Sequence, residues 1–164
     1  MTDRFETDLI EAVPALRRYA LSLCRRGDVA DDLVQITAER AMAGRRGYDP
    51  ATAVRPWLFR ILRNAWIDMT RRQITRGTEV DVHEMPEAAI YDGSRASEAS
   101  LALRETEAAL ATLPADQREV IRLVCFEELS YAEAAEVLEI PKGTVMSRLA
   151  RGRVALAEKL GLNR

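Results

Sequence analysis

Six hydrogen-bond donors near the carboxyl end of the chain are spaced for contact with nucleic acid; they are Lys142, Thr144, Ser147, Arg148, Arg151 and Arg153. Four of them, from Thr144 to Arg151, recur at i, i+3, i+4 and i+7, which places them on one face of a helix. Hydroxyl and guanidinium groups donate to phosphate oxygens and to base edges in a major groove. The solvated face of an ordinary amphipathic helix carries similar side chains, so the neighbouring elements decide between the two interpretations.

The segment before these donors predicts a helix-turn-helix. Ser130 and Glu133 have the spacing of a capping box, which starts a helix, and small Ala134 and Ala135 allow a second helix to approach closely. Residues 139–143 suffice only for a turn, and a last helix is expected over about 144–160. Because the start of the second helix meets the bases in this motif, we assign base contacts to Thr144, Ser147 and Arg148, and phosphate contacts to Lys142, Arg151 and Arg153.

The first part of the chain predicts a bundle of three or four helices over about residues 5–73. An apolar stripe runs from Leu9 to Leu23, and Pro14 is expected to break or restart this helix. A second helix follows, with Asp28 as its expected N-cap, and ends near Gly44. A third helix opens near Pro56.

Two polar faces of this bundle are candidate interfaces. On the second helix, an acidic and amide face steps by four, three and four residues and suits a basic partner; its members are Asp28, Asp32, Gln35 and Glu39. On the third helix, basic side chains suit phosphates, while amide and carboxylate groups suit base edges. These residues are Arg60, Arg63, Asn64, Asp68, Arg71 and Arg72. Trp57 and Trp66 could stack on single-stranded bases or pack in the core, and both alternatives stay open.

Composition predicts an all-α protein without catalytic, metal or cofactor chemistry. Aromatic residues make up only 5% of the 164 residues, which favours helices over strands. One histidine and two distant cysteines give no zinc-ligand spacing, and we expect Cys24 and Cys125 to be buried, reduced thiols. No apolar run is long enough to span or insert into a membrane, and no secretory signal is present, so we expect a cytoplasmic protein.

The distribution of charge and periodicity predicts two domains and a linker. Residues 74–98 lose the helical period and are acidic, so we expect a flexible linker between domains at 1–73 and 99–164. The net charge is only −2, whereas a free-standing DNA-binding protein is usually basic. DNA affinity must therefore come from local patches or from a larger complex.

Several of these segments together resemble a known family. LPADQREV (113–120), LSYAEAA (129–135) and GTVMSRLARGR (143–153) are similar to the domain of sigma factors that reads the −35 promoter element. ADDLVQ (30–35) and RPWLFRILRNAWID (55–68) resemble the sigma domain that binds RNA polymerase and melts the −10 element. With two such domains and none between them, the chain resembles an extracytoplasmic-function (ECF) sigma factor. Met146 is a departure, because many relatives carry a lysine there.

The resemblance implies a non-enzymatic subunit that directs core RNA polymerase to promoter DNA, with a stress or envelope regulon. The face of Asp28, Asp32, Gln35 and Glu39 would dock on the clamp helices of the beta-prime subunit, and the beta flap would be a second contact. The loop at about 48–55 would capture a flipped-out base of the −10 element. An anti-sigma factor is the other expected partner, and no small-molecule substrate is implied.

Two alternatives remain at the level of sequence. A stand-alone helix-turn-helix regulator would need a ligand pocket or a dimer interface, and the first block suggests neither. A sigma-like decoy that titrates an anti-sigma factor would usually carry a receiver domain, and its DNA-binding arginines would serve no purpose. Arg148, Arg151 and Arg153 therefore favour a chain that binds DNA.

Overall fold

The computed structural model describes residues 3–77 and 98–162. The chain divides into two compact units, called here the N-terminal and the C-terminal unit, and each is a separate assembly of helices. The described residues contain no strand, which confirms the all-α prediction. The predicted linker, 74–98, lies almost wholly outside the described residues, apart from the end of one helix and the start of the next.

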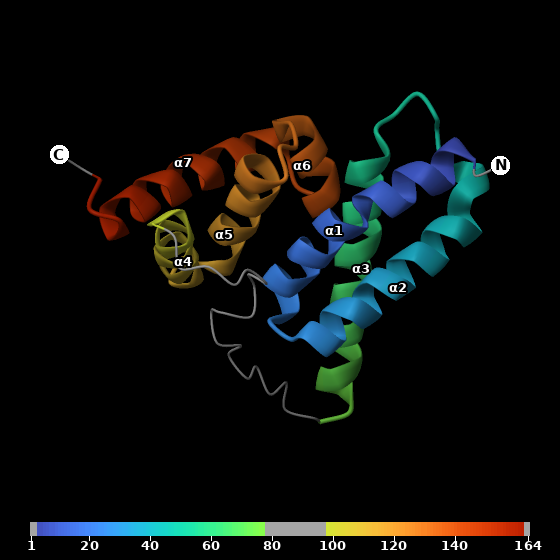
Figure 1. The fold of residues 1–164 in the computed structure, drawn as a ribbon, viewed down its shortest axis with the longest axis horizontal. Coiled ribbons are helices and arrows are strands. Elements are labelled where there is room, and N and C mark those ends of the chain that lie inside the picture. Colours follow the sequence, from blue (N-terminus) through green and yellow to red (C-terminus); the bar gives the residue numbers. More distant parts are fainter. Residues whose placement is uncertain (1–2, 78–97, 163–164) are drawn as a thin grey trace. The chain divides into compact units, whose positions relative to one another are not determined.

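The N-terminal unit is a bundle of three helices that contact one another pairwise (Figure 1). They are α1 (Arg4–Cys24), α2 (Gly27–Gly44) and α3 (Val54–Thr75), with a short 3₁₀ turn η1 (Arg45–Gly47) after α2. The core lies between their apolar stripes, where Leu33, Leu58 and Leu62 are fully buried. The third helix starts two residues before Pro56 and continues two residues past the predicted boundary at 73.

The predicted break at Pro14 is wrong, because α1 continues through this residue. Proline removes only one backbone hydrogen bond, the one that would reach Ile10. Both Pro14 and Ile10 lie on the exposed side of α1, where water can satisfy the carbonyl. Buried Ala12, Ala15 and Leu16 flank the proline on the inner side and hold the two halves of the helix against α2 and α3.

The start of α2 also differs from the prediction. Arg25, in the left-handed conformation, ends α1, and the extended Arg26 is the N-cap of α2. Asp28 therefore lies in the first turn and not at the cap. Its carboxylate accepts hydrogen bonds from the Arg26 guanidinium at 2.8 and 3.2 Å. This interaction lowers the pKa of Asp28, so its side chain is anionic at neutral pH. A negative charge in the first turn also interacts favourably with the positive end of the helix dipole.

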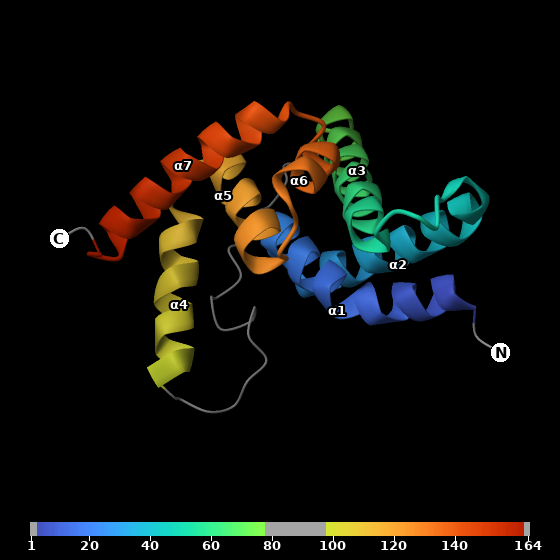
Figure 2. The ribbon, with the colours of Figure 1, turned by 90° about the horizontal axis from the view of Figure 1, so that it is seen from above.

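The C-terminal unit contains the predicted helix-turn-helix (Figure 2). Its elements are α4 (Glu98–Ala111), α5 (Ala115–Ile121), a π-helical turn η3 (Arg122–Phe126), α6 (Tyr131–Leu138) and α7 (Lys142–Lys159). The capping box is present: the Ser130 hydroxyl accepts from the Glu133 amide at 3.1 Å, and the Ser130 amide donates to the Glu133 carboxylate at 2.8 Å. Helix α7 packs on both α5 and α6, through buried Val145 and Leu149.

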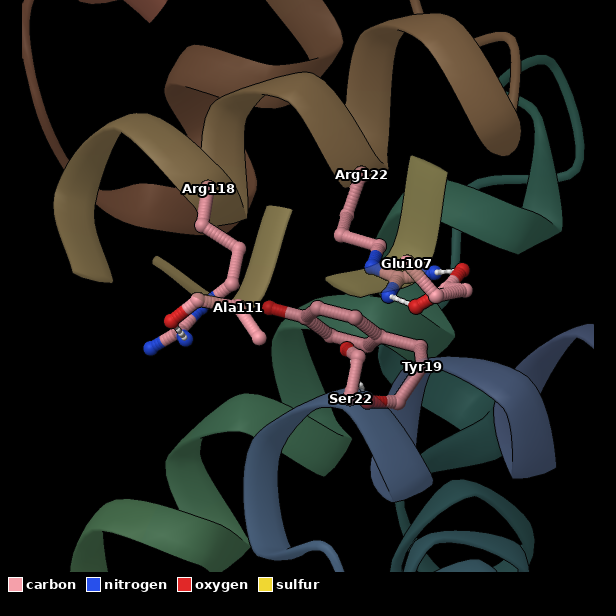
Figure 3. Close-up of polar contacts among 6 residues, drawn as sticks. All are labelled: Tyr19, Ser22, Glu107, Ala111, Arg118 and Arg122. Atoms are coloured by element: carbon pink, nitrogen blue, oxygen red, sulfur yellow. Dashed lines mark hydrogen bonds and ion pairs between the residues drawn. The ribbon is translucent and has the colours of Figure 1, made fainter. Parts of the chain in front are cut away.

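A buried ion pair connects α4 to the turn that follows α5. The Arg122 guanidinium donates two hydrogen bonds to the Glu107 carboxylate, one of them at 2.7 Å, and Glu107 is only 5% exposed (Figure 3). Arg122 also lies over the Phe126 ring, and Arg118 donates to the carbonyl of Ala111 at 3.2 Å. Two-pronged contact with a carboxylate is among the strongest hydrogen-bonding arrangements of an arginine side chain. Figure 3 also shows a local contact within α1, where the Ser22 hydroxyl donates to the carbonyl of Tyr19 at 2.6 Å.

Close packing of α7 on α5 depends on Gly152. A methyl group at this position would lie 2.8 Å from Cδ1 of Ile121 and 3.4 Å from Cβ of Gln117. Ile121 is buried, so its side chain has little room to move away. The glycine therefore sets how near the two helices come.

Gly152→Ala is expected to destabilise the C-terminal unit. Gly143→Ala is the matched control, because it lies on the same helix and nothing would meet its new methyl group within 4 Å. Both variants gain up to about 1 kcal/mol of helix propensity, but Gly152→Ala also pays about 1–3 kcal/mol for overpacking. Hydrogen exchange of α7 amides at increasing urea concentrations would measure the difference in unfolding free energy between the two variants. Equal stability of the two variants would show that the contact is not tight.

Candidate nucleic-acid and polymerase interfaces

Thr144, Ser147, Arg148 and Arg151 form one polar face of α7, whereas Lys142 and Arg153 lie on the other flank of its buried stripe, Val145, Leu149 and Gly152. Of the six predicted donors, four are exposed and two, Thr144 and Arg148, are half-buried; the exposed ones are Lys142, Ser147, Arg151 and Arg153. Local contacts hold part of this face, since the Ser147 hydroxyl donates to the carbonyl of Thr144 at 3.1 Å. Arg151 Nε lies 3.4 Å from the carbonyl of Ser147. The structure thus brings four of the six donors together on one face of the helix, with Lys142 and Arg153 on its other flank. Met146, 49% exposed, lies beside them.

Arg148, the central donor of this face, has a partner that sequence reasoning missed. Its Nε lies 3.5 Å from a carboxylate oxygen of Asp116, in the first turn of α5. The Arg148 side chain is 28% exposed, so it retains access to solvent while it is held against α5. Asp116 belongs to the segment 113–120, but only the crossing of α5 and α7 brings it to Arg148.

Cys125 is exposed, so the prediction of two buried thiols is wrong for this residue; both cysteines are free, and Cys24 is buried. The π-helical turn explains the difference, because it adds a residue to one turn and rotates the following side chains relative to an α-helix. Its i to i+5 hydrogen bond joins the amide of Glu127 to the carbonyl of Arg122. The Cys125 sulfur lies 3.9 Å from the Arg153 guanidinium, and this contact raises the pKa of Arg153, which keeps its charge.

The predicted basic face of α3 is also present. Arg60, Arg71 and Arg72 are exposed, whereas Arg63, Asn64 and Asp68 are half-buried. The Asp68 carboxylate accepts from Arg40 of α2 at 3.3 Å. This carboxylate therefore already has a partner within the bundle, and it would have to share or exchange it to contact a base.

The loop between α2 and α3 is tied to α1 by an aromatic cluster, defined here as Phe5, Tyr48 and Trp57. Ring centroids are separated by 5.7 Å for Phe5 and Tyr48, 6.0 Å for Phe5 and Trp57, and 5.1 Å for Tyr48 and Trp57. Trp57 is half-buried and also lies beside Gly44, which favours the packing alternative for this residue. Trp66 is half-buried too, and its two alternatives stay open.

A cavity of about 510 Å³ lies next to this loop, between α1 and the start of α3. Its walls combine carboxylate, guanidinium and apolar groups, and they belong to Asp8, Glu11, Ala12, Pro14, Ala15, Arg18, Ala53, Val54 and Arg55. The last three residues join the loop to α3, so movements of the loop would change the shape of this cavity.

The predicted acidic and amide face of α2 is fully accessible. Asp28, Asp32, Gln35 and Glu39 are all exposed, and the Gln35 amide donates to the Glu39 carboxylate at 3.1 Å. Asp31, on a neighbouring face, is instead paired with Arg17 of α1 at 3.0 Å. The stripe is therefore a distinct surface, separated from the acid that takes part in helix packing.

Neither a metal cluster nor a membrane span is found in the described parts of the chain. Within residues 3–77 and 98–162, no three His, Cys, Asp or Glu side chains are grouped to hold a metal ion. None of the helices in these ranges has the length and hydropathy needed to cross a bilayer.

Comparison with known proteins connects both units to one family. The family model described as sigma-70 region 2 matches residues 9–75, and the model described as sigma-70 region 4 matches residues 103–156. The first span contains α3 with its basic face, and the second contains all six donors of α7 and all but the last three residues of that helix. A stand-alone regulator would account for the helix-turn-helix but not for the match of the N-terminal unit.

Individual relatives agree over nearly the whole chain. The ECF RNA polymerase sigma factor EcfG of Rhodopseudomonas palustris is 38% identical over 98% of this chain and 87% of its own. The sigma factor RpoE of Bartonella quintana, solved in complex with the anti-sigma factor NepR, has a TM-score of 0.82 and 34% identity, covering 99% of this chain and 100% of its own. CnrH, solved with the cytosolic domain of CnrY, has a TM-score of 0.67 and 28% identity, and the match covers 98% of this chain and 89% of the CnrH chain.

The fold and these matches define the class of protein: a two-domain, helical specificity subunit of RNA polymerase, not an enzyme. The chain belongs to the sigma-70 family, as an ECF sigma factor, and directs transcription initiation. This confirms the family expected from the sequence, and it sets aside the stand-alone regulator and the decoy.

In the native protein, alkylation should distinguish the two cysteines. Cys125 is exposed, whereas burial raises the pKa of the Cys24 thiol, which also donates to the carbonyl of Arg26 at 3.2 Å. Reaction at Cys24 needs a local opening, and an opening free energy of only about 1.4 kcal/mol already slows it about tenfold. Iodoacetamide labelling followed by peptide mass spectrometry measures both rates. In denaturant the rates should converge; equal rates in the native protein would contradict the described packing.

Proposed function

We propose that α7 reads the −35 promoter element through its six donors, four on its polar face and two, Lys142 and Arg153, on its other flank. The observation that supports this most is the combination of a buried stripe, which fixes the rotation of α7, with a separate polar face made by Thr144, Ser147, Arg148 and Arg151. The start of a recognition helix meets base edges, so Thr144, Ser147 and Arg148 are proposed to contact bases. Lys142, Arg151 and Arg153 then contact phosphates.

In the N-terminal unit, α3 and the loop before it are proposed to bind the −10 element as it opens. The arginines at 60, 63, 71 and 72 would neutralise phosphates, and Asn64 and Asp68 would hydrogen-bond base edges. Asp68 would give up or share its contact with Arg40, which costs little because exposed ion pairs contribute only about 0–1 kcal/mol. The adjoining loop would hold a base flipped out of the duplex, with the neighbouring cavity available to it.

The exposed face of α2 is proposed to bind core RNA polymerase at the clamp helices of the beta-prime subunit. Asp28 and Asp32 supply negative charge, while Gln35 and Glu39 form a hydrogen-bonded pair that offers further acceptors. Such a surface suits a basic partner helix. The beta flap is proposed as a second polymerase contact of the C-terminal unit.

An anti-sigma factor is proposed as the regulatory partner. One solved relative, RpoE, is in complex with the anti-sigma factor NepR, and another, CnrH, is in complex with the cytosolic domain of CnrY. The protein would then act in the cytoplasm, where polymerase and promoters lie, and would serve a stress or envelope regulon. Its binding would compete with polymerase for the faces described above.

Run-off transcription with purified core polymerase tests the α2 surface. The unmodified chain should give discrete transcripts from genomic fragments, and the double variant Asp32→Ala, Gln35→Ala should lose them. We expect core affinity to fall about 10- to 100-fold, or about 1.4–2.8 kcal/mol, because two interfacial groups are removed. Asp31→Ala is the matched control, since it removes an exposed acid of the same helix that pairs with Arg17. Equal loss in the control would refute the assigned face.

DNA-binding measurements on variants of α7 distinguish base contacts from phosphate contacts. On a −35 duplex mapped by run-off, Arg148→Ala should cost about 1–3 kcal/mol and relax specificity at one position, because a base contact is lost. Arg151→Ala should weaken specific and scrambled duplexes alike and lower the salt slope by about 1, because a phosphate contact is lost. Fluorescence anisotropy at several salt concentrations measures both. The assignment fails if Arg148→Ala weakens both duplexes equally.

A further inference from the structure

The segment from Asp3 to Glu6 at the start of α1 makes contacts that lie far from its own helix core. Phe5 is 7% exposed and packs against Tyr48, the first residue of the loop between η1 and α3, and against Trp57, in the first turn of α3. Its ring thus connects the start of the loop to the helix that follows it. Removing the ring would leave both loop ends without their shared support.

Arg45 makes a second connection between the same two segments. Its guanidinium is paired with the carboxylate of Asp3, lies 3.7 Å from that of Glu6, and is 5.5 Å from the centre of the Phe5 ring. These contacts join η1, which precedes the loop, to the first turn of α1. Because the Arg45 side chain is 40% exposed, they contribute little to overall stability. Their effect is on the position of the residues that follow Arg45.

The loop itself is held in one shape by its own hydrogen bonds. The Tyr48 hydroxyl donates to the carbonyl of Thr52, and the Thr52 amide and hydroxyl donate to the carbonyl of Asp49 at 3.0 and 2.8 Å. The Asp49 carboxylate accepts from the amide of Ala51 at 2.9 Å. A loop that is ordered internally moves as one body, so its placement is decided by its anchors at Tyr48 and Trp57.

We propose that Phe5 and Arg45 are positioning residues that hold the loop at 48–53 where it captures the flipped −10 base, so that the start of α1 controls promoter opening. This inference rests on the proposed role of the loop in −10 binding. Neither residue is proposed to touch DNA. They act through Tyr48 and Trp57, and they reduce the ordering that the loop must undergo when a base arrives.

Two variants probe the anchor from different sides. Phe5→Leu removes the ring but keeps an apolar side chain, and Arg45→Gln removes the ion pairs without touching the core. The control is Leu16→Val, which trims a buried side chain of α1 about three turns from Phe5. Hydrogen exchange of the free full-length protein gives the first readout. The amides of Tyr48, Ala51 and Thr52 should exchange faster in Phe5→Leu and in Arg45→Gln than in the unmodified protein. Their exchange rates should not change in Leu16→Val. Unchanged loop exchange in the first two variants would overturn the inference.

The second readout is open-complex formation with core polymerase, followed by permanganate reactivity of unpaired thymines on a promoter mapped by run-off. Both variants should bind core polymerase normally, yet form open complexes about tenfold less efficiently on duplex DNA, because base extrusion costs a few kcal/mol and its capture is impaired. A template with a pre-opened −10 region should restore most of the signal. If open-complex formation falls no more in these variants than in Leu16→Val, the inference is overturned. If the unmodified chain forms no open complex on any template, the proposed function is overturned instead.

Discussion

Burial of one side of each functional helix is the constraint on which all three candidate interfaces depend. Leu33 in α2, Leu62 in α3 and Leu149 in α7 are buried on the side away from the polar face. These contacts fix the rotation of each helix about its axis. A change of one residue in register would turn the polar face by about 100° and move its donors away from a partner. Apolar packing therefore determines where charge is presented.

The polar contacts of the protein fall into two classes with different consequences. Arg148, half-buried, and exposed Asp116 form a partly solvated pair at 3.5 Å, which contributes about 1 kcal/mol or less and can be exchanged for contact with DNA at little cost. Glu107 and Arg122 form a buried pair, and removing one partner would leave a charge uncompensated, at a cost of about 3–5 kcal/mol. The first class restrains side chains until a partner binds, and the second holds α4 to the rest of the C-terminal unit.

Most of the helices and their polar faces followed from local sequence. The capping box at Ser130 and Glu133 was identified from spacing alone, because both of its hydrogen bonds span only three residues. The stripes of α2, α3 and α7 followed from helical periodicity, since burial of one face imposes that period. Two predictions from local sequence were wrong. Pro14 does not break α1, because the packing of this helix holds it together. Asp28 is the second residue of α2, not its N-cap.

The sequence by itself therefore determined the helical class, the two blocks and the residue types of each face. Only the tertiary structure decided which distant residues meet: Asp116 with Arg148, and Phe5 with Tyr48 and Trp57. It also placed Cys125 at the surface, through a π-helical turn that an α-helical period does not anticipate. Periodicity is a property of neighbouring residues and can be read locally. Contacts between helices depend on how closely the helices cross, which is decided by the packing of the whole unit.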